Sequence, residues 1–524
     1  MRSEPRALGG VPARELLGIG LILAGAAALR FYSLPGRGQW DADQGHDMLV
    51  LLNFVRFGEW PLLGPPTSIG DVHHGALYYY LLAPAAWLSD ADPVAVTAVI
   101  ALCGVAAVAV TWWLARSIGG PIAGFVAALL MAVSASAVDE STFIWNPNLI
   151  ALSSSVALAG AWGAWSSERA RPLAWVVAFG GAIVTMHCHV LGAILVPAIV
   201  APWILDIRGR SGAERRRLLV AGVVGAVMLV LSYVPLLIHE VQSTFSETQA
   251  ALAFLAGGAE SSSVSLPARI AVIGLRVLAW PLVGLITNAP VAALLAAAAV
   301  IASIVWRAIA GDGPERRAAR WFGLTLIWTT LALAVAASGL ATVIPRLPND
   351  HYHAFADPIV FVSLGLGVAG IVGAAQRTNA DRGRPVAYAV AATIVIAIAG
   401  FNVARQPPAV SPDGGWPAGD AAAVRVLETI GDARRAALLS LPDFKSADAL
   451  GFPLTRRGAA IEATSSGPEP VVVLCDALFV EAIGAPCGGP AEDALLAGDA
   501  VSLADRFESA PDRWVSVYVP NAGD

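Results

Sequence analysis

Ionisable side chains are concentrated in the stretch WDADQGHD, Trp40 to Asp47, where three aspartates and one histidine occur within eight residues. The stretch follows the first long apolar segment, so it is expected at a membrane surface. A carboxylate there can act as a general base toward a hydroxyl group. A solvated loop would explain the same composition, and helix capping or an ion pair with Arg56 is expected for Asp41 and Asp47.

The remaining ionisable groups follow the same pattern. The eight histidines are His46, His73, His74, His187, His189, His239, His351 and His353. The accompanying carboxylates are Asp41, Asp43, Asp47, Asp71, Asp139, Glu140, Asp350 and Asp357. Every histidine lies on or near one side of the membrane topology predicted below, whereas the middles of the spans are almost free of charge. A proton- or ion-coupled transporter would place such groups near the midplane, so we expect chemistry at one membrane surface.

The composition is that of a polytopic membrane protein. Of 524 residues, 56% are hydrophobic and 14% charged, and the mean hydropathy is +0.66; soluble proteins carry about 25% charged residues. The net charge of −6 gives no indication of nucleic-acid binding, and membrane lipids are the expected surroundings. About eleven spans are predicted, at 16–34, 94–115, 119–138, 147–165, 172–187, 190–206, 218–238, 289–310, 321–341, 354–375 and 386–404.

Arginine clusters set the predicted orientation, because cytoplasmic loops are enriched in basic residues. Clusters such as RGRSGAERRR (208–217) are placed inside, which puts the N-terminus in the cytoplasm and the C-terminus outside a plasma (inner) membrane. Counting the apolar run Arg269 to Thr287 as a span would put GDGPERRAAR (311–320) outside. We therefore expect that run to be an interfacial helix on the outer surface. A cleaved N-terminal secretion signal is the alternative for the first segment.

A change of composition divides the chain. Residues 1–404 form the predicted transmembrane domain, 405–420 a linker rich in proline and glycine, and 421–524 a small extracytoplasmic α/β domain. Cys475 and Cys487 both fall in this last domain, where disulfides persist. Whether they are bridged is left open; a bridge would stabilise the fold by about 3 kcal/mol.

A site at the membrane surface suits a substrate that is itself half lipid. A lipid-linked sugar has an apolar tail for the bilayer, a phosphate for the interface and a sugar for water. Because the transmembrane part contains no lysine, arginine or histidine must meet that phosphate. The candidates are His73, His74 and Arg346.

Four motifs carry a resemblance to a known family. DADQGHD, GPPTSIGDVHHGALYYYLLAP, FIWNPN and HYHAFADP occur in this order along the chain. Together they resemble bacterial glycosyltransferase family 39, in the GT-C superfamily with the protein O-mannosyltransferases and the lipid A aminoarabinose transferase. The resemblance covers about residues 16–404. It implies a mainly α GT-C membrane fold, with juxtamembrane helices in a long first outer loop.

The resemblance also implies roles for individual residues. Asp43 corresponds to the catalytic aspartate of the first outer loop, and Gln44 stands where many relatives have a second acid. His74 takes the phosphate-proximal position, although glycine and alanine follow it where relatives have two prolines. Asp139 would assist on the acceptor side. The predicted substrate-binding residues are His73, His74, Arg346, Gln44, His351, His353 and Tyr78.

These inferences favour an inverting glycosyltransferase that uses a polyprenyl-phosphate sugar and no cofactor. Asp43 would activate an acceptor hydroxyl on a glycan, lipid or protein, and the polyprenyl phosphate would leave against His74 and Arg346. One alternative is a divalent metal site built from HCH (187–189), HH (73–74) and HYH (351–353). Others are a flippase or transporter for lipid-linked glycans, and an envelope-glycan binding protein without activity.

Overall fold

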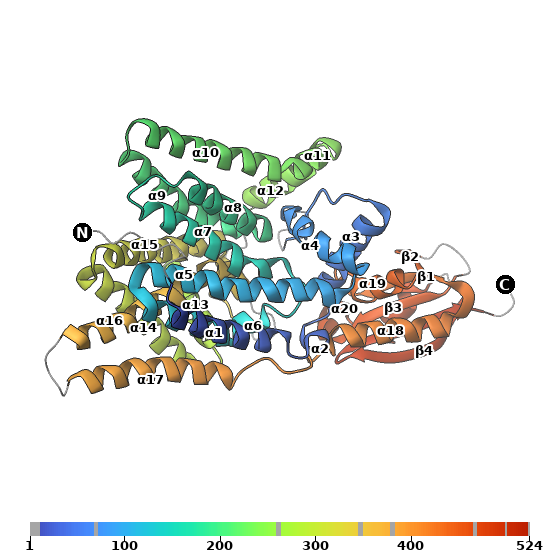
Figure 1. Ribbon diagram of the computed structural model, residues 1–524. Coiled ribbons are helices and arrows are strands. Elements are labelled where there is room, and N and C mark those ends of the chain that lie inside the picture. Colours follow the sequence, from blue (N-terminus) through green and yellow to red (C-terminus); the bar gives the residue numbers. More distant parts are fainter. Residues whose placement is uncertain are drawn as a thin grey trace.

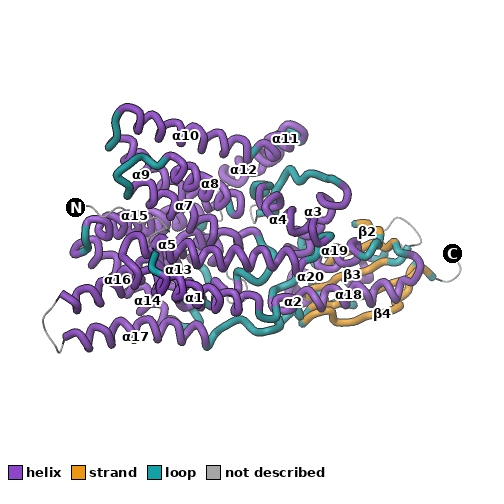
Figure 2. Tube along the Cα trace, in the orientation of Figure 1, coloured by secondary structure: helices purple, strands orange, loops and turns teal. Residues whose placement is uncertain are grey.

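Long helices run side by side in a bundle, and a small α/β domain caps one end of it (Figure 1). The computed structural model describes residues 11–67, 72–257, 264–343, 349–377, 383–464, 469–497 and 500–521. The strands are confined to the capping domain (Figure 2), as expected for a GT-C-type membrane protein with a C-terminal α/β domain. We call the capped end of the bundle the domain end.

The long helices of the bundle have little polar surface and vary in length. Their bounds are α1 (Ala13–Phe31), α5 (Pro93–Val133), α7 (Ile150–Trp165), α8 (Pro172–Cys188), α9 (Val196–Arg208), α10 (Gly212–Ser232), α13 (Leu266–Val283), α14 (Pro290–Ala310), α15 (Gly313–Ala336), α16 (Asp357–Arg377) and α17 (Gly383–Val403). Helix α5 has 41 residues, about twice what a bilayer requires. It bends at Gly120, where φ is 81°, just before Pro121, and so supplies two of the predicted spans.

Among the described residues, seven helices are long and apolar enough to cross a membrane, or eight if the bent pair α10 and α11 (Val234–Gln242) forms one span. The sequence prediction of about eleven differs for identifiable reasons. It counts α5 twice, includes α1, α7 and α8, which are too charged or too short for this test of length and hydropathy, and leaves out α13. The protein is thus a multi-pass membrane protein.

Helix α13 bears on one expectation from the sequence. The run from Arg269 to Thr287 was expected to be an interfacial helix on the outer surface, and α13 packs with one side against α14, α15 and α16, where Ile273 and Val277 are fully buried. Both of its ends contact the domain ends of other helices: Arg269 donates to the Ala334 carbonyl at the end of α15, and the Ser134 hydroxyl, just after α5, donates to the Pro281 carbonyl. That α13 does not cross the membrane therefore stays a prediction.

Arg276 can be buried in α13 because Asp350 neutralises it. Two hydrogen bonds, of 2.8 and 2.7 Å, join its guanidinium to the two carboxylate oxygens. Arg276, which in the sequence indicates a membrane interface, is therefore buried and paired with Asp350.

Shorter elements form the connections. The first connection contains α2 (Leu34–Arg37), α3 (Ala42–Phe57) and α4 (Leu77–Ser89). The others contribute α6 (Ala135–Asp139), η2 (Asn146–Leu149), η3 (Val190–Leu195), α12 (Ser246–Gly257), η4 (Ser338–Ala341) and η5 (Asp350–Ala356). Helices α2 and α3 lie next to the α/β domain (Figure 1), so the acidic first connection is at the domain end.

The C-terminal domain is built on one five-stranded sheet with the order β2-β1-β3-β5-β4. The strands are β1 (Arg435–Leu441), β2 (Ala460–Glu462), β3 (Val471–Asp476), β4 (Val501–Ala510) and β5 (Arg513–Pro520). Strands β2, β1 and β3 are parallel, whereas β5 pairs antiparallel with both β3 and β4. The helices are α18 (Gly415–Ile430), α19 (Asp448–Arg456), α20 (Val480–Ile483) and α21 (Pro490–Leu495).

Two details of this domain bear on the sequence predictions. Cys475 and Cys487 form a disulfide, with their Cα atoms 5.8 Å apart. Helix α18 begins at Gly415, inside the segment 405–420 that was expected to be a linker. The connection between bundle and domain is accordingly shorter than predicted.

The buried pair of Arg276 and Asp350 gives a stability prediction. Arg276→Met keeps the apolar stem of the side chain but leaves the Asp350 carboxylate buried without its partner. We expect the free energy of unfolding to fall by about 3 kcal/mol, measured as a lower melting temperature in detergent. Arg425→Met, which breaks the exposed pair with Asp505, is the control and should leave the melting temperature almost unchanged. Equal effects would contradict the prediction.

Candidate active site

The first turn of α3 is fixed by a capping box. The side chain of Asp41 accepts a hydrogen bond of 2.8 Å from the Ala42 N–H, and the Asp41 N–H donates to Gln44 Oε1 at 2.9 Å. The expected capping role of Asp41 is thereby confirmed. Gln44 Nε2 donates to the Ile144 carbonyl at 2.9 Å, and the side chain is 2% exposed. Gln44 therefore joins α3 to the second connection and faces protein.

Asp43 is the carboxylate of this turn that remains accessible. Its side chain is exposed, yet surrounding protein raises its pKa above the ordinary value, and the Asp41 carboxylate raises it further. His46, a hydrogen bond from Trp145 and the Lys445 ammonium act in the opposite direction. Asp43 is thus an accessible carboxylate with protein packed close around it, and a raised pKa makes it a better proton acceptor.

A continuous series of ring contacts leads from Asp43 to His74. Trp145, whose side chain lowers the pKa of Asp43 as a hydrogen-bond donor, lies with its ring 4.2 Å from the ring of His351. His351 is 5.5 Å from His189, and His189 is 4.9 Å from His74, all between ring centroids. Four connections that are far apart in sequence meet here, and they bring together the predicted site residues Asp43, His74 and His351.

Trp145 and His189 were not among the predicted site residues. Trp145 lies within the FIWNPN motif, and His189 lies in HCH, which was weighed only as part of a metal site. The motif could have indicated Trp145, since an indole N–H at a membrane surface is a hydrogen-bond donor beside an apolar body. Its contact with Asp43 depends on how two connections pack, which a single sequence does not reveal.

Backbone N–H groups fix the tautomers of two of these histidines. The Val190 N–H donates to His74 Nδ1 at 3.3 Å, and the Leu191 N–H donates to His189 Nδ1 at 3.2 Å. Each ring therefore carries its proton on Nε2. Burial, together with nearby His73, lowers the pKa of His74 to about 4. His74 is thus a neutral N–H donor at neutral pH.

The adjacent His73 points to a different part of the structure. Its Nδ1 lies 2.8 Å from Glu247 Oε1, and its backbone N–H donates to Glu247 Oε2 at 2.7 Å. Gly75, on the other side of His74, packs against a histidine ring: a Cβ added there would lie 1.7 Å from His187 Nδ1. His73 is therefore tied to α12, and only a residue without a side chain fits after His74.

Tyr78 belongs to a buried hydrogen-bond network and is not accessible to a substrate. The Tyr78 and Tyr79 hydroxyls donate to the two oxygens of Asp47 at 2.9 and 2.8 Å. Tyr78 is fully buried, and Asp47 is 2% exposed. The ion pair expected between Arg56 and Asp47 is wrong, because Arg56 pairs with Asp90 at 2.6 Å. Asp47 and Tyr78 thus join α3 to α4.

The remaining predicted residues lie in other groups. The side chain of Asp139 reaches solvent at the end of α6. The protein packed around it still raises its pKa to about 6, against the effect of Arg37. The charges that influence Asp139 differ from those that influence Asp43, so the two carboxylates form separate electrostatic groups. His353 is buried and contacts Asp350 at 3.1 Å. Arg346 lies outside the described residues.

The hypothesis of a metal site finds no ligand cluster in the part of the chain that the structure describes. There, no three histidine, cysteine or acidic side chains are placed to hold one ion. The two histidines of HCH diverge: His187 Nε2 lies 2.9 Å from Ser232 Oγ, whereas His189 contacts His74. They diverge because His187 is in the last turn of α8, whereas His189 has an extended backbone just beyond the helix.

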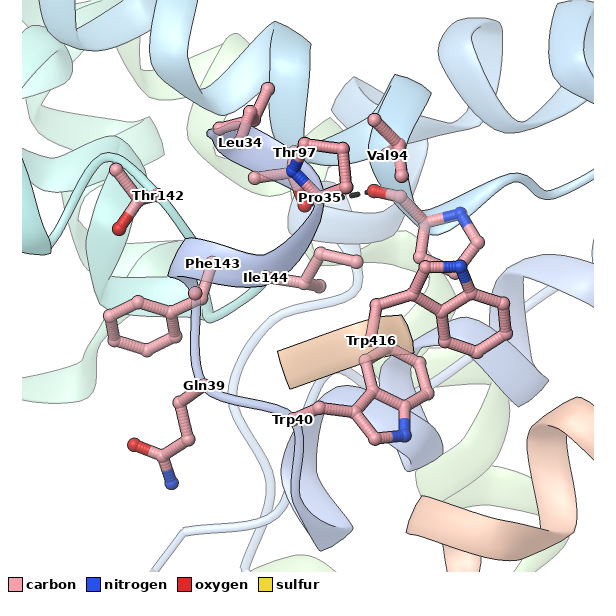
Figure 3. Close-up of a pocket in the computed structure, with 12 residues that line it drawn as sticks. Leu34, Pro35, Gln39, Trp40, Val94, Thr97, Thr142, Phe143, Ile144 and Trp416 are labelled. Carbon is pink, nitrogen blue, oxygen red and sulfur yellow. Dashed lines mark hydrogen bonds between the residues drawn. The ribbon is translucent and has the colours of Figure 1, made fainter. Parts of the chain in front are cut away.

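A small cavity lies where the first and second connections meet the C-terminal domain. It is lined by Trp40, Ile144 and Trp416, among others, and Figure 3 shows the indoles of Trp40 and Trp416 close together. Its volume is about 20 Å³, enough for roughly one water molecule. This seam is therefore packed, and no sugar would fit into it.

The fold of this chain is shared with solved structures of other proteins. No family model matches the sequence, and no curated protein does. The structure does resemble ArnT from Cupriavidus metallidurans in the apo state, with a TM-score of 0.59 and 15% identity, over 96% of this chain and 98% of that chain. ArnT bound to undecaprenyl phosphate matches with a TM-score of 0.58, 14% identity and coverage of 97% and 98%.

A second enzyme matches over a shorter part. The Archaeoglobus fulgidus oligosaccharyltransferase, in complex with zinc and sulfate, has a TM-score of 0.55 and 16% identity, over 87% of this chain and 67% of that one. Both neighbours belong to the GT-C superfamily. This chain therefore has the GT-C fold, as its motifs predicted.

The buried Asp47 gives a pH-dependent prediction. Burial raises its pKa to about 7 in the folded protein, against hydrogen bonds from Tyr79 and Tyr78. A raised carboxyl pKa contributes stability that is present below the unfolded pKa near 4 and is lost as the pH rises through about 7. Relative to Asp47→Asn, the wild type should be most stable at pH 4 and lose at most about 4 kcal/mol by pH 8. Melting temperatures of both proteins across this range would test it; a constant difference would contradict it.

Proposed function

We propose that this protein is an inverting glycosyltransferase that moves a hexosyl or pentosyl group from a polyprenyl phosphate to an acceptor hydroxyl. The observation that carries the proposal is the series of contacts from the accessible Asp43 carboxylate through Trp145 and His351 to His74. It places a proton acceptor at one end of the series and neutral N–H donors at the other. Both ends lie at the domain end of the bundle.

In the proposed reaction, Asp43 takes the proton of the acceptor hydroxyl while the hydroxyl oxygen attacks the anomeric carbon. The bond from that carbon to the phosphate oxygen breaks on the opposite face, and polyprenyl phosphate leaves with the electron pair. His74 donates its Nε2–H to a phosphate oxygen, and the incoming dianion would raise the pKa of the ring and favour its protonation. Arg346 and Asp139 remain in the proposal as phosphate and acceptor contacts.

The likeness to ArnT supports a lipid-linked donor, because ArnT binds undecaprenyl phosphate. The oligosaccharyltransferase was captured with an acceptor peptide, so a protein acceptor is as compatible with the fold as a glycan or a lipid. We place the reaction on the outer face of the plasma membrane, with the N-terminus in the cytoplasm, because the arginine clusters lie away from the domain end. No cofactor is part of the proposal; metal analysis of purified protein, with and without chelator, tests the alternative.

Asp43→Asn tests the assignment of the base. Since an amide cannot take the proton, we expect transfer to fall by about 100-fold or more, while expression and melting temperature stay unchanged. The assay follows release of undecaprenyl phosphate from a panel of labelled undecaprenyl-phosphate hexoses and pentoses. Asp432→Asn, at an exposed position of the C-terminal domain, is the matched control. A wild-type rate in Asp43→Asn would refute the assignment.

His74→Phe tests the phosphate contact without requiring the correct sugar. The variant keeps a buried ring but lacks the N–H donor, and one hydrogen bond to a charged group is worth about 1.5–3 kcal/mol. We expect the Kd for undecaprenyl phosphate to rise by about 10-fold or more, measured by quenching of tryptophan fluorescence. His239→Phe, on α11, serves as control and should bind as the wild type does. Unchanged binding in His74→Phe would remove this residue from the proposal.

The assay for release of undecaprenyl phosphate separates an enzyme from a protein that only binds or moves the lipid. A flippase or a glycan-binding protein would bind undecaprenyl phosphate but would leave the sugar–phosphate bond intact. An enzyme releases undecaprenyl phosphate in detergent solution, where no second compartment exists. Absence of release with every donor of the panel would favour the binding alternatives.

A further inference from the structure

The C-terminal domain holds the segment that begins α3. Trp40 is 3% exposed and lies in an aromatic socket, 4.6 Å from Trp416 and 5.7 Å from Phe452 between ring centroids. Its indole N–H donates to the Ala449 carbonyl at 2.8 Å. An anchor of this size, three residues before Asp43, fixes where the chain enters the helix.

Two cations of the domain converge on Asp41. Lys445, the only lysine in the chain, lies 3.1 Å from Asp41 Oδ2 and also pairs with Asp476. Arg513 lies 2.8 Å from Asp41 Oδ1 and donates to the Trp40 carbonyl at 2.9 Å. Both pairs are largely shielded from solvent, so they are screened less than surface pairs. Because Asp41 caps α3, these contacts act on the turn that carries Asp43.

The domain also touches the next turn of α3. A Cβ added at Gly45 would lie 2.1 Å from the Asp448 carbonyl oxygen, so only glycine allows this approach. His46 Nδ1 lies 3.1 Å from Asp448 Oδ2. The domain is thus packed directly onto the helix, next to the second connection, which supplies Trp145.

We infer that the C-terminal domain completes the candidate active site, with Lys445 and Arg513 as positioning residues that hold Asp41 and thereby orient Asp43. The inference rests on the proposed function. A domain that merely recruited an acceptor would need no such contacts with α3. A domain that orients the base must contact the capping residue, and this one does so with two cations.

The two cations also act through charge. Asp43 is influenced by Asp41 and His46 from its own helix, by Trp145 from the second connection and by Lys445 from the C-terminal domain. Without Lys445, the Asp41 carboxylate would be only partly compensated, and Asp43 would hold its proton more strongly. The base would then be available only at a higher pH.

Lys445→Met tests the inference in the full-length protein. We expect kcat to fall by about 10-fold through displacement of Asp43, while KM for the donor stays within about twofold. The acidic limb of the pH–rate profile should move up by about half a pH unit. Lys445→Arg should restore both. Arg457→Met, which breaks an exposed pair with Asp420 inside the domain, is the matched control and should leave all three quantities unchanged.

A double variant distinguishes the loss of the Lys445 charge from a folding defect. Removing both charges in Asp41→Asn/Lys445→Met should return the acidic limb to its wild-type position or below it, because the Asp41 carboxylate, which raises the pKa of Asp43 more than Lys445 lowers it, is gone. Wild-type kcat and pH profile in a Lys445→Met/Arg513→Met protein, together with an inactive Asp43→Asn, would overturn the inference and leave the proposed function intact. An active Asp43→Asn would instead overturn the proposed function.

Discussion

The arrangement of the site depends on one short turn, the N-terminal turn of α3. Asp41 ends the preceding loop by capping the helix, and in the same position it receives Lys445 and Arg513 from a domain some 400 residues later in the chain. A capped helix start sets the direction of the next side chains, so Asp43 is aimed by contacts it does not make itself. Bundle, second connection and C-terminal domain all meet on this turn.

Burial gives neighbouring ionisable groups different properties. Asp47 is hydrogen-bonded to two tyrosine hydroxyls, and burial raises its pKa to about 7. Asp43, one helical turn earlier, stays accessible. His74 is buried, has no carboxylate partner among the described residues and is neutral, whereas His46 beside Asp448 has a raised pKa. The proposed reaction, which accepts a proton and releases a phosphate at one surface, needs such differences between like residues.

Some features could be predicted because they depend on local composition. Apolar runs gave the membrane class, and the break of α5 at Gly120–Pro121 agrees with two adjacent spans. The motifs led to the GT-C fold, and the spacing of Cys475 and Cys487 allowed the disulfide that is present. The burial of Arg276 in α13 could not be predicted, because its partner is not visible in the sequence around it. Asp350, which neutralises Arg276, lies 74 residues away in sequence.

The sequence by itself determined that this is a multi-pass membrane protein, that its ionisable groups collect at one end, and that Asp43 is the foremost candidate for a base. Hydropathy and charge are properties of each residue, so they can be read without coordinates. Only the tertiary structure decided that Trp145 joins Asp43 to His351, that His74 is neutral, and that Lys445 reaches Asp41. Such contacts depend on how distant elements pack, and burial, more than residue type, sets the resulting charge.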